Sequence, residues 1–459
     1  MKTAKPKLVV IGNGMAPGRA LEKLFENAPD AYDVTIFNAE TRVNYDRIML
    51  SPVLSGEKTF EDIIIHGDDW YADRGIKLHK GHRVVRIDRA AKTVSSEHGI
   101  TAPYDKLIVA TGSVPIVLPV PGRDLSGVLT YRDLDDVDAM LAAAKNGGRA
   151  VVIGGGLLGL EAAAGLRLRG MDVTVLHLMP TLMERQLDPA AAGLLKAAVE
   201  ARGITVMTKA NTHEIIGTDA GDGPARVRAV RLDDGTEIAC EIVVMAVGIR
   251  PNIALLKDAG LEVNRGLVVG ADMRSSDPEI LGVGECVEAS GQVFGLVAPL
   301  YEMATVAAAQ LCNDPSARFA PGATATKLKV SGIDLFSAGD FGDGPGREEI
   351  VLRDVAHGIY KRLVIEKGRL VGIVMYGDTT DSAWFFDLIR RGEPVDAMRD
   401  TLIFGPDFAE SEPLDPTVAV AALPDKAGAG RCSGEFTSTI CDVEGACQPA
   451  APGRERAVA

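Results

Sequence analysis

Two glycine-rich fingerprints, each at the end of a short aliphatic run, constrain this chain more than any other feature. The first reads LVVIGNGMAPG over residues 8–18, and the second reads AVVIGGGLLG over residues 150–159. A strand that runs through a glycine turn into a helix presents backbone N–H groups and the positive end of the helix dipole to a pyrophosphate. One such match is weak evidence, because glycine turns are common. Two matches, each after a predicted strand, indicate that the chain binds two dinucleotides.

Each fingerprint opens a similar succession of predicted elements. A strand, a helix and a second strand are expected at 8–11, 19–25 and 33–37 in the first unit and at 150–153, 160–169 and 172–176 in the second. Each unit then closes on a buried-type strand that ends in a glycine turn, KLIVATG at 106–112 and EIVVMAVG at 241–248. Strands that alternate with helices in this way predict α/β units with parallel sheets.

The bulk composition restricts the partners. A formal net charge of −14 over 459 residues argues against nucleic acid or an anionic membrane surface as a partner. No apolar run approaches the roughly 18 residues of a membrane span, and the first residues lead into a strand without a secretory apolar segment. We therefore expect a cytoplasmic protein without membrane attachment. Six cysteines are too few and too scattered for a disulfide framework.

Several motifs together resemble a known superfamily. In order and spacing, IGNGMAPG, KLIVATGS, VVIGGGLLGLE, VVMAVGIRPN and EILGVGECVE are similar to the two-dinucleotide-domain flavoprotein reductases of the pyridine nucleotide-disulfide oxidoreductase superfamily, over about residues 7–312. Three further segments, NYDRIMLS, VLHLMPTLMERQLD and KLKVSGIDLFSAGD, look like the flavin portion of assimilatory nitrite reductase large subunits. They equally resemble the electron-transfer flavoproteins of assimilatory nitrate reductases, and they extend the match to about residue 405.

The resemblance implies an α/β fold with two Rossmann-like dinucleotide-binding domains and a C-terminal α+β domain. The expected FAD-binding domain is split between residues 1–115 and 253–318, and an NAD(P)-binding domain over 116–252 is inserted into it. The third region, 319–409, alternates strand signals before an aromatic helix at 382–391. From about Glu410 the composition turns to Pro, Ala, Gly and Ser, which predicts a flexible tail over 410–459.

The resemblance also implies which residues hold FAD. They are Gly12, Gly14, Gly18, Glu40, Tyr45, Asp46, Arg47, Thr111, Gly112, Gly284 and Glu285. Glu40 follows the second strand, where an acidic residue normally accepts hydrogen bonds from the adenosine ribose; a solvated turn residue is the alternative. Glu285 stands where the family usually has Asp, so the backbone there must retract slightly.

A second set is expected at the nicotinamide dinucleotide. It comprises Gly154, Gly156, Gly159, Glu161, His177 and Gly248. NADPH sites tend to carry Arg or Lys after the second strand, and neither occurs over 171–184, so NADH is favoured over NADPH. His177 is neither an acid nor a strong base, and a plain strand-edge role for it is equally open. No residue is assigned to catalysis.

What the sequence lacks restricts the chemistry. No Cys precedes Cys240, which excludes the cysteine pair that flavin disulfide reductases use to receive electrons. Oxygenase-coupled ferredoxin reductases usually carry Lys after the Leu-Ser of NYDRIMLS, whereas this chain has Pro52. Electrons are therefore expected to leave the flavin for an external acceptor, which the resemblance implies to be an iron–sulfur or molybdenum/sirohaem reductase of assimilatory nitrate or nitrite type. A rubredoxin or ferredoxin reductase, and a non-catalytic flavin-binding scaffold or redox sensor, are the alternatives.

The remaining cysteine and histidine motifs give only weak evidence for a metal or cluster site. Cys432, Cys441 and Cys447 supply three thiols where a [2Fe–2S] module needs four, so a degenerate remnant is favoured over a cluster completed by a partner. His79 and His82 are expected in a surface turn, and no metal site is expected. The resemblance leaves a homodimer open.

Overall fold

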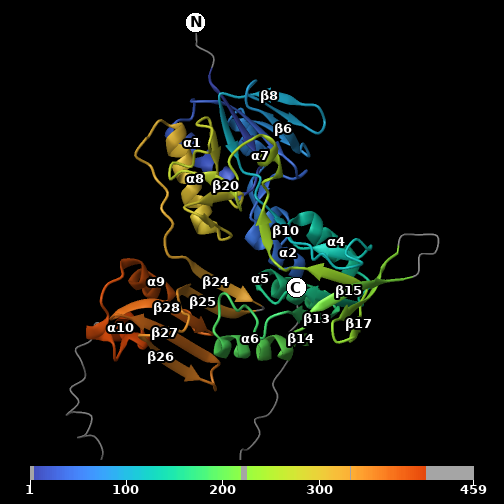
Figure 1. The fold of residues 1–459 in the computed structure, drawn as a ribbon, viewed down its shortest axis with the longest axis vertical. Coiled ribbons are helices and arrows are strands. Elements are labelled where there is room, and N and C mark those ends of the chain that lie inside the picture. The colour runs from blue at the N-terminus through green and yellow to red at the C-terminus, as the bar shows by residue number, and fades with distance from the viewer. Residues whose placement is uncertain (1–4, 219–224, 331, 410–459) are drawn as a thin grey trace, which may run out of the picture. The chain divides into compact units, whose positions relative to one another are not determined.

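Figure 1 shows the computed structural model, which describes residues 5–218, 225–330 and 332–409. The tail predicted over 410–459, with its three cysteines, lies outside the described residues.

The first unit is a five-stranded parallel sheet in the order β21-β9-β1-β2-β5. Its strands are β1 (Lys7–Ile11), β2 (Asp33–Asn38), β5 (Lys77–Lys80), β9 (Lys106–Val109) and β21 (Ile280–Gly282). Helix α1 (Met15–Asn27) follows β1 and packs against α8 (Val297–Leu311), as Figure 1 shows. Because β21 pairs with β9, a segment from late in the chain completes the first sheet.

The second unit repeats this arrangement in the order β11-β18-β12-β13-β14, again with all strands parallel. Its strands are β11 (Val128–Thr130), β12 (Arg149–Ile153), β13 (Asp172–His177), β14 (Ile204–Thr208) and β18 (Ile242–Met245). Its helices are α4 (Leu134–Ala144), α5 (Leu157–Leu168) and α6 (Pro189–Ala201). The central strands β1 and β12 are buried from their second residue to their last, as expected for strands covered on both faces.

Each unit carries an antiparallel three-stranded ribbon and shorter elements. The ribbons are β6 (Val84–Asp88), β7 (Thr93–Ser96) and β8 (Thr101–Pro103) in the first, and β15 (Thr212–Gly217), β16 (Val227–Leu232) and β17 (Glu237–Ala239) in the second. The first unit also contains β3 (Asn44–Tyr45), α2 (Leu50–Ser55), β4 (Ile64–His66), α3 (Asp68–Asp73), α7 (Ala254–Asp258), β20 (Leu267–Val269), β22 (Val287–Ala289) and β23 (Gln292–Val293). The chain passes between the units on β10 (Ser113–Pro115) and β19 (Ile249–Pro251), which pair antiparallel.

Helices α1 and α5 begin earlier than the sequence predicts, at Met15 instead of residue 19 and at Leu157 instead of residue 160. Both helices have glycine at the N-cap, Gly14 and Gly156, with no side-chain capping bond. The usual start signal, a Ser, Thr, Asp or Asn cap, is therefore missing from the sequence. Without that signal, the sequence places the first turn of each helix too late.

The third region is an antiparallel sheet in the order β24-β25-β28-β27-β26, which confirms the predicted C-terminal α+β domain. Its elements are β24 (Ala325–Val330), β25 (Ile333–Gly339), β26 (Arg347–Asp354), β27 (Ile359–Glu366), β28 (Arg369–Tyr376), α9 (Ser382–Arg391) and α10 (Pro406–Ala409). The sheet also contacts α6 of the second unit. The Tyr360 hydroxyl donates to the buried Asp188 carboxylate at 2.6 Å, and Arg362 lies 3.7 Å from the same oxygen.

Replacing Tyr360 by Phe tests that contact. Loss of a hydrogen bond to a buried carboxylate is expected to lower the free energy of unfolding by about 1.5–3 kcal/mol. The matched control is Tyr376→Phe, whose hydroxyl makes only a 3.4 Å bond to the Leu194 carbonyl. Loss of that weaker bond should cost about 0.5 kcal/mol. Urea unfolding followed by circular dichroism measures both, and equal losses would contradict the assignment.

Candidate functional site: two glycine cradles and their contact

The first glycine loop lies where β1 runs into α1. Gly12 has a φ of +104°, and a Cβ at that position would lie 2.2 Å from the Ala110 carbonyl oxygen, so no other residue fits. A Cβ on Gly14 would meet nothing within 4 Å, which means that this position faces open space at the uncapped start of α1. Open space beside unpaired helix N–H groups fits a pyrophosphate. The loop therefore suits the dinucleotide that the sequence predicts there.

Asn44 holds this loop, a role that the sequence motifs do not assign to it. It is fully buried, and its Nδ2 donates to the carbonyls of Asn13 at 2.8 Å and Gly14 at 2.7 Å. A Cβ on Gly18 would lie only 3.1 Å from that nitrogen, so the third glycine makes room for Asn44. Its signal in the sequence is its place in NYDRIMLS, directly before Tyr45.

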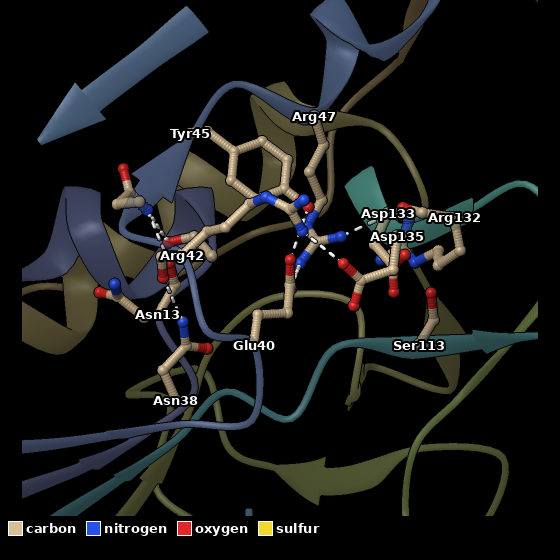
Figure 2. Close-up of polar contacts among 12 residues, drawn as sticks. Asn13, Asn38, Glu40, Arg42, Tyr45, Arg47, Ser113, Arg132, Asp133 and Asp135 are labelled. Atoms are coloured by element: carbon tan, nitrogen blue, oxygen red, sulfur yellow. Dashed lines mark hydrogen bonds and ion pairs between the residues drawn. The ribbon is translucent and has the colours of Figure 1, made fainter. Parts of the chain in front are cut away.

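The predicted residues Glu40, Tyr45 and Arg47 lie together, as Figure 2 shows. Tyr45 donates to the Glu40 carboxylate at 2.7 Å, Arg47 forms an ion pair with the same carboxylate, and Arg47 also lies 5.0 Å from the Tyr45 ring centroid. Burial raises the pKa of Tyr45, so its hydroxyl stays neutral. A carboxylate has about four acceptor positions, which leaves Glu40 able to accept from a ribose as well. Asp46 accepts from the Ile48 N–H and caps a short 3₁₀ turn.

Glu285 connects three parts of the chain. Its carboxylate accepts from the Ser113 hydroxyl at 2.8 Å and forms an ion pair with Arg132, which lies just before α4. Arg132 also accepts, through its carbonyl, a 3.1 Å bond from Arg47 (Figure 2). The Glu40 and Glu285 groups therefore belong to one network. No sequence signal points to Arg132, because it lies 153 residues from Glu285.

Thr111 and Gly112 form hydrogen bonds between the two segments on which the chain passes from one unit to the other. The Thr111 hydroxyl donates to the Asn252 carbonyl at 2.7 Å, and the Asn252 N–H donates to the Gly112 carbonyl at 2.9 Å. Gly284 adopts a left-handed φ of +90° against Ala16 of α1. Because β1 and β21 both pair parallel with β9, Glu285 and the first glycine loop lie at the same end of the first sheet.

The second glycine loop has the same construction. A Cβ on Gly154, at a φ of +124°, would lie 2.2 Å from the Ala246 carbonyl oxygen, and one on Gly159 would lie 1.9 Å from the Gly154 oxygen. A Cβ on Gly156, the N-cap of α5, would meet nothing within 4 Å. The second loop therefore also fits a dinucleotide phosphate.

His177 supports the second loop instead of lying free at the strand edge. The Gly155 N–H donates to its Nδ1 at 3.0 Å, which leaves the proton on Nε2, 3.1 Å from the carboxylate of Glu184. Gly248 turns the chain between β18 and β19 at a φ of +112°. Glu161, also predicted at this site, accepts from Ser51 of α2 at 2.6 Å.

Comparison with known proteins decides the family. The sequence matches the pyridine nucleotide-disulphide oxidoreductase family over residues 6–310 and the rubredoxin NAD+ reductase C-terminal domain over residues 325–393. The chain belongs to the pyridine nucleotide-disulphide oxidoreductase family. It is an oxidoreductase, and membership implies the use of a flavin and a pyridine nucleotide.

Individual relatives agree with this placement. A nitrite reductase [NAD(P)H] of Bacillus subtilis is 44% identical over 95% of this chain and 53% of its own length. The assimilatory nitrate reductase electron transfer subunit of the same organism is 39% identical over 90% of this chain and 53% of its own length. The chain thus spans about half the length of these curated relatives. The crystal structure of NADH:rubredoxin oxidoreductase from Clostridium acetobutylicum superposes with a TM-score of 0.72 at 26% identity, covering 88% of this chain and 98% of that one.

The described part of the chain shows three further properties. Cys240, Cys286 and Cys312 are free thiols, and burial raises the pKa of Cys240 to about 12 and also raises that of Cys286. Within the described ranges, no three His, Cys, Asp or Glu side chains gather as metal ligands; His79 stacks on Phe37 and its ring centroid lies 5.6 Å from that of His82. No helix among these residues is long and apolar enough to cross a membrane.

Two glycine substitutions separate folding from cofactor binding. Gly14→Ala and Gly156→Ala place a methyl group in open space, so thermal unfolding of the protein freed of cofactor should shift by at most a few degrees. The methyl group should nevertheless obstruct the phosphate and weaken binding by at least about tenfold, or about 1.4 kcal/mol.

Titration calorimetry tests this prediction at each site separately. Gly14→Ala should lose flavin, and Gly156→Ala should keep flavin but lose pyridine nucleotide. Gly12→Ala serves as the contrast, because its methyl group would collide with the Ala110 carbonyl and should impair folding itself. Unchanged affinities in both of the first two variants would show that the cradles are not the binding sites.

Proposed function

We propose that the chain is a cytoplasmic FAD-dependent NAD(P)H oxidoreductase that passes electrons to a metal-centre acceptor, an assimilatory nitrate or nitrite reductase. The observation that carries the proposal is the pair of uncapped glycine cradles, Gly14 and Gly156, in a chain with no cysteine before Cys240. The relatives that are a nitrite reductase and a nitrate reductase electron transfer subunit support the choice of acceptor.

In this proposal the FAD domain comprises residues 1–115 and 253–318, the NAD(P) domain 116–252 and the C-terminal domain 319–409. FAD, when bound, accepts two electrons as hydride and gives them up singly. The backbone N–H groups at the start of α1 bind its pyrophosphate, Glu40 accepts from its ribose, and Glu285 accepts from its ribityl chain. Helix α5 binds the nucleotide pyrophosphate in the same way. The Ser113 and Arg132 contacts orient Glu285.

NADH is the proposed donor. The Glu184 carboxylate is held beside His177 where β13 ends. A negative charge at this position disfavours the 2′-phosphate of NADPH by repulsion. We expect Glu184→Gln to lower the ratio of the affinity for NADH to the affinity for NADPH.

A rubredoxin or ferredoxin reductase is the second candidate. It is favoured by the match of residues 325–393 to the C-terminal domain of rubredoxin NAD+ reductases. The two candidates share the same cofactors and the same route into the flavin, and they differ in the acceptor alone.

Anaerobic mixing tests the proposal. The FAD-loaded protein should bleach within seconds with NADH, more slowly with NADPH, and should recover its colour with a one-electron acceptor. Purified nitrate or nitrite reductase partners and rubredoxin can then be compared as acceptors. A fully loaded protein that neither nucleotide bleaches would establish the scaffold alternative instead.

The absence of a thiol relay gives an independent expectation. Cys286 follows Glu285 directly but is fully buried, and burial raises its thiol pKa. Cys286→Ala should therefore leave the rate of flavin reduction within about twofold of the parent, because a protonated, buried thiol is a poor nucleophile. A large loss of rate in stopped-flow reduction, with FAD still bound, would implicate the thiol.

A further inference from the structure

A partly buried carboxyl group joins the two dinucleotide-binding units. Glu161 lies in the second turn of α5, and its Oε2 accepts from Ser51 of α2 at 2.6 Å. The Ser51 hydroxyl also lies 2.9 Å from the hydroxyl of the buried Tyr131, which follows β11. Ser51 has one hydroxyl proton, so when it donates to Glu161 the Tyr131 hydroxyl must donate to Ser51. The three groups form one directed chain across the contact.

Apolar packing surrounds this chain. Leu54 of α2 fits against Gly165 of α5 so closely that a Cβ there would lie 2.6 Å from the Leu54 side chain. Leu54 belongs to the same core as Leu160 and Leu166 of α5. Helix α2 lies shortly after the Tyr45–Arg47 segment at the first cradle, and α5 begins at the second. Their contact therefore fixes the separation between the two cradles.

Among the side chains that the structure describes, no cation forms an ion pair with the partly buried Glu161 carboxyl. The described charged and titratable side chains on the elements packed against α5 are Asp135, Asp136, Asp138, Arg149, Asp172, His177 and Lys327. Tyr131, Asp133 and Lys145 flank α4, and Arg167 and Arg169 lie on α5 and at its C-cap. Arg149 pairs with Glu241, Arg167 with Asp172, and His177 with Glu184. Arg169 donates to the Leu54 and Val53 carbonyls. Burial raises the pKa of Glu161 to about 7, and donation from Ser51 only partly opposes it.

We propose that Glu161 is a positioning residue that acts as a proton-dependent latch: its neutral form joins α5 to α2, and its ionised form loosens that contact. An ionised carboxylate with one hydroxyl donor and no cation is costly to bury. The closed latch keeps the nicotinamide unit aligned with the flavin unit, so loosening it should slow hydride transfer. This consequence rests on the proposed function.

The direction with pH follows from linkage. In the loosened state the carboxyl is solvated and has its ordinary pKa of 4.5, whereas in the closed contact its pKa is about 7. Closing therefore takes up a proton between these two values. Raising the pH through this window shifts the equilibrium toward the loosened state by up to about tenfold per unit, or about 300-fold in total, and above it no further change occurs.

Hydrogen exchange of the flavin-loaded full chain tests the latch without reference to turnover. After correction for intrinsic exchange rates, protection of the α2 and α5 amides should fall at least about tenfold between about pH 5.5 and pH 8. Glu161→Gln, a neutral isostere, should keep its protection at the higher pH. The matched control is Glu200→Gln on α6, which removes a surface pair with Lys196 and should behave as the parent does.

Two further arms keep the outcomes distinct. Tyr131→Phe removes the hydroxyl that supports Ser51 and should lower the protection of the α2 and α5 amides at the lower pH. This variant tests the latch even if Glu161→Gln does not fold. Anaerobic bleaching by NADH should slow as the pH rises in the parent and stay level in Glu161→Gln. Protection that is independent of pH in the parent, or bleaching with the same pH profile in both proteins, would overturn the latch. If neither NADH nor NADPH bleaches the flavin at any pH, the proposed function is overturned, and the hydrogen-exchange result still stands.

Discussion

The close approach of each glycine loop to the neighbouring strand determines the geometry of the whole site. At Gly12 and again at Gly154 the backbone passes so near a carbonyl of the adjacent strand end that a single methyl group would not fit. This approach, with a left-handed φ, turns the chain from the central strand into a helix without a capping side chain. The helix therefore starts with unpaired N–H groups at the carboxyl end of the sheet, where nucleotides bind in α/β folds. The position of every other site residue depends on that turn.

The two loops are held by different chemistry. In the first, Asn44 donates to loop carbonyls and leaves the loop N–H groups available to an anion. In the second, His177 accepts from the Gly155 N–H and so removes one donor from the cradle. Pro17 has no N–H, so the start of α1 also lacks one donor, and the two cradles differ in how they are held and not in the number of their donors.

Much of this architecture is predictable from sequence, because it rests on local signals. The strands, the glycine turns and helix α9 follow from runs of apolar residues, glycine spacing and an aromatic helical face. The missed features depend on contacts between distant segments: Arg132 meets Glu285 only in the folded chain, and Asn44 reaches a loop about 30 residues earlier. The sequence places Glu161 at the nucleotide because it follows the glycines. Its hydrogen bond from Ser51, which lies 110 residues earlier in the chain, forms only in the folded protein and has no local signal in the sequence.

The contact between the units combines groups of very different exposure. Arg42 pairs with Asp135 of α4 (Figure 2) and with Asp138 of the same helix, whose side chains are 72% and 59% exposed. The Arg132–Glu285 pair is largely shielded, with side chains 18% and 13% exposed. Salt screens the outer pairs far more than the inner one. Raising the ionic strength should therefore weaken the exposed pairs of Arg42, whereas the inner part of the contact responds to the protonation of Glu161. Protons and salt therefore act on the contact between the two units through separate groups.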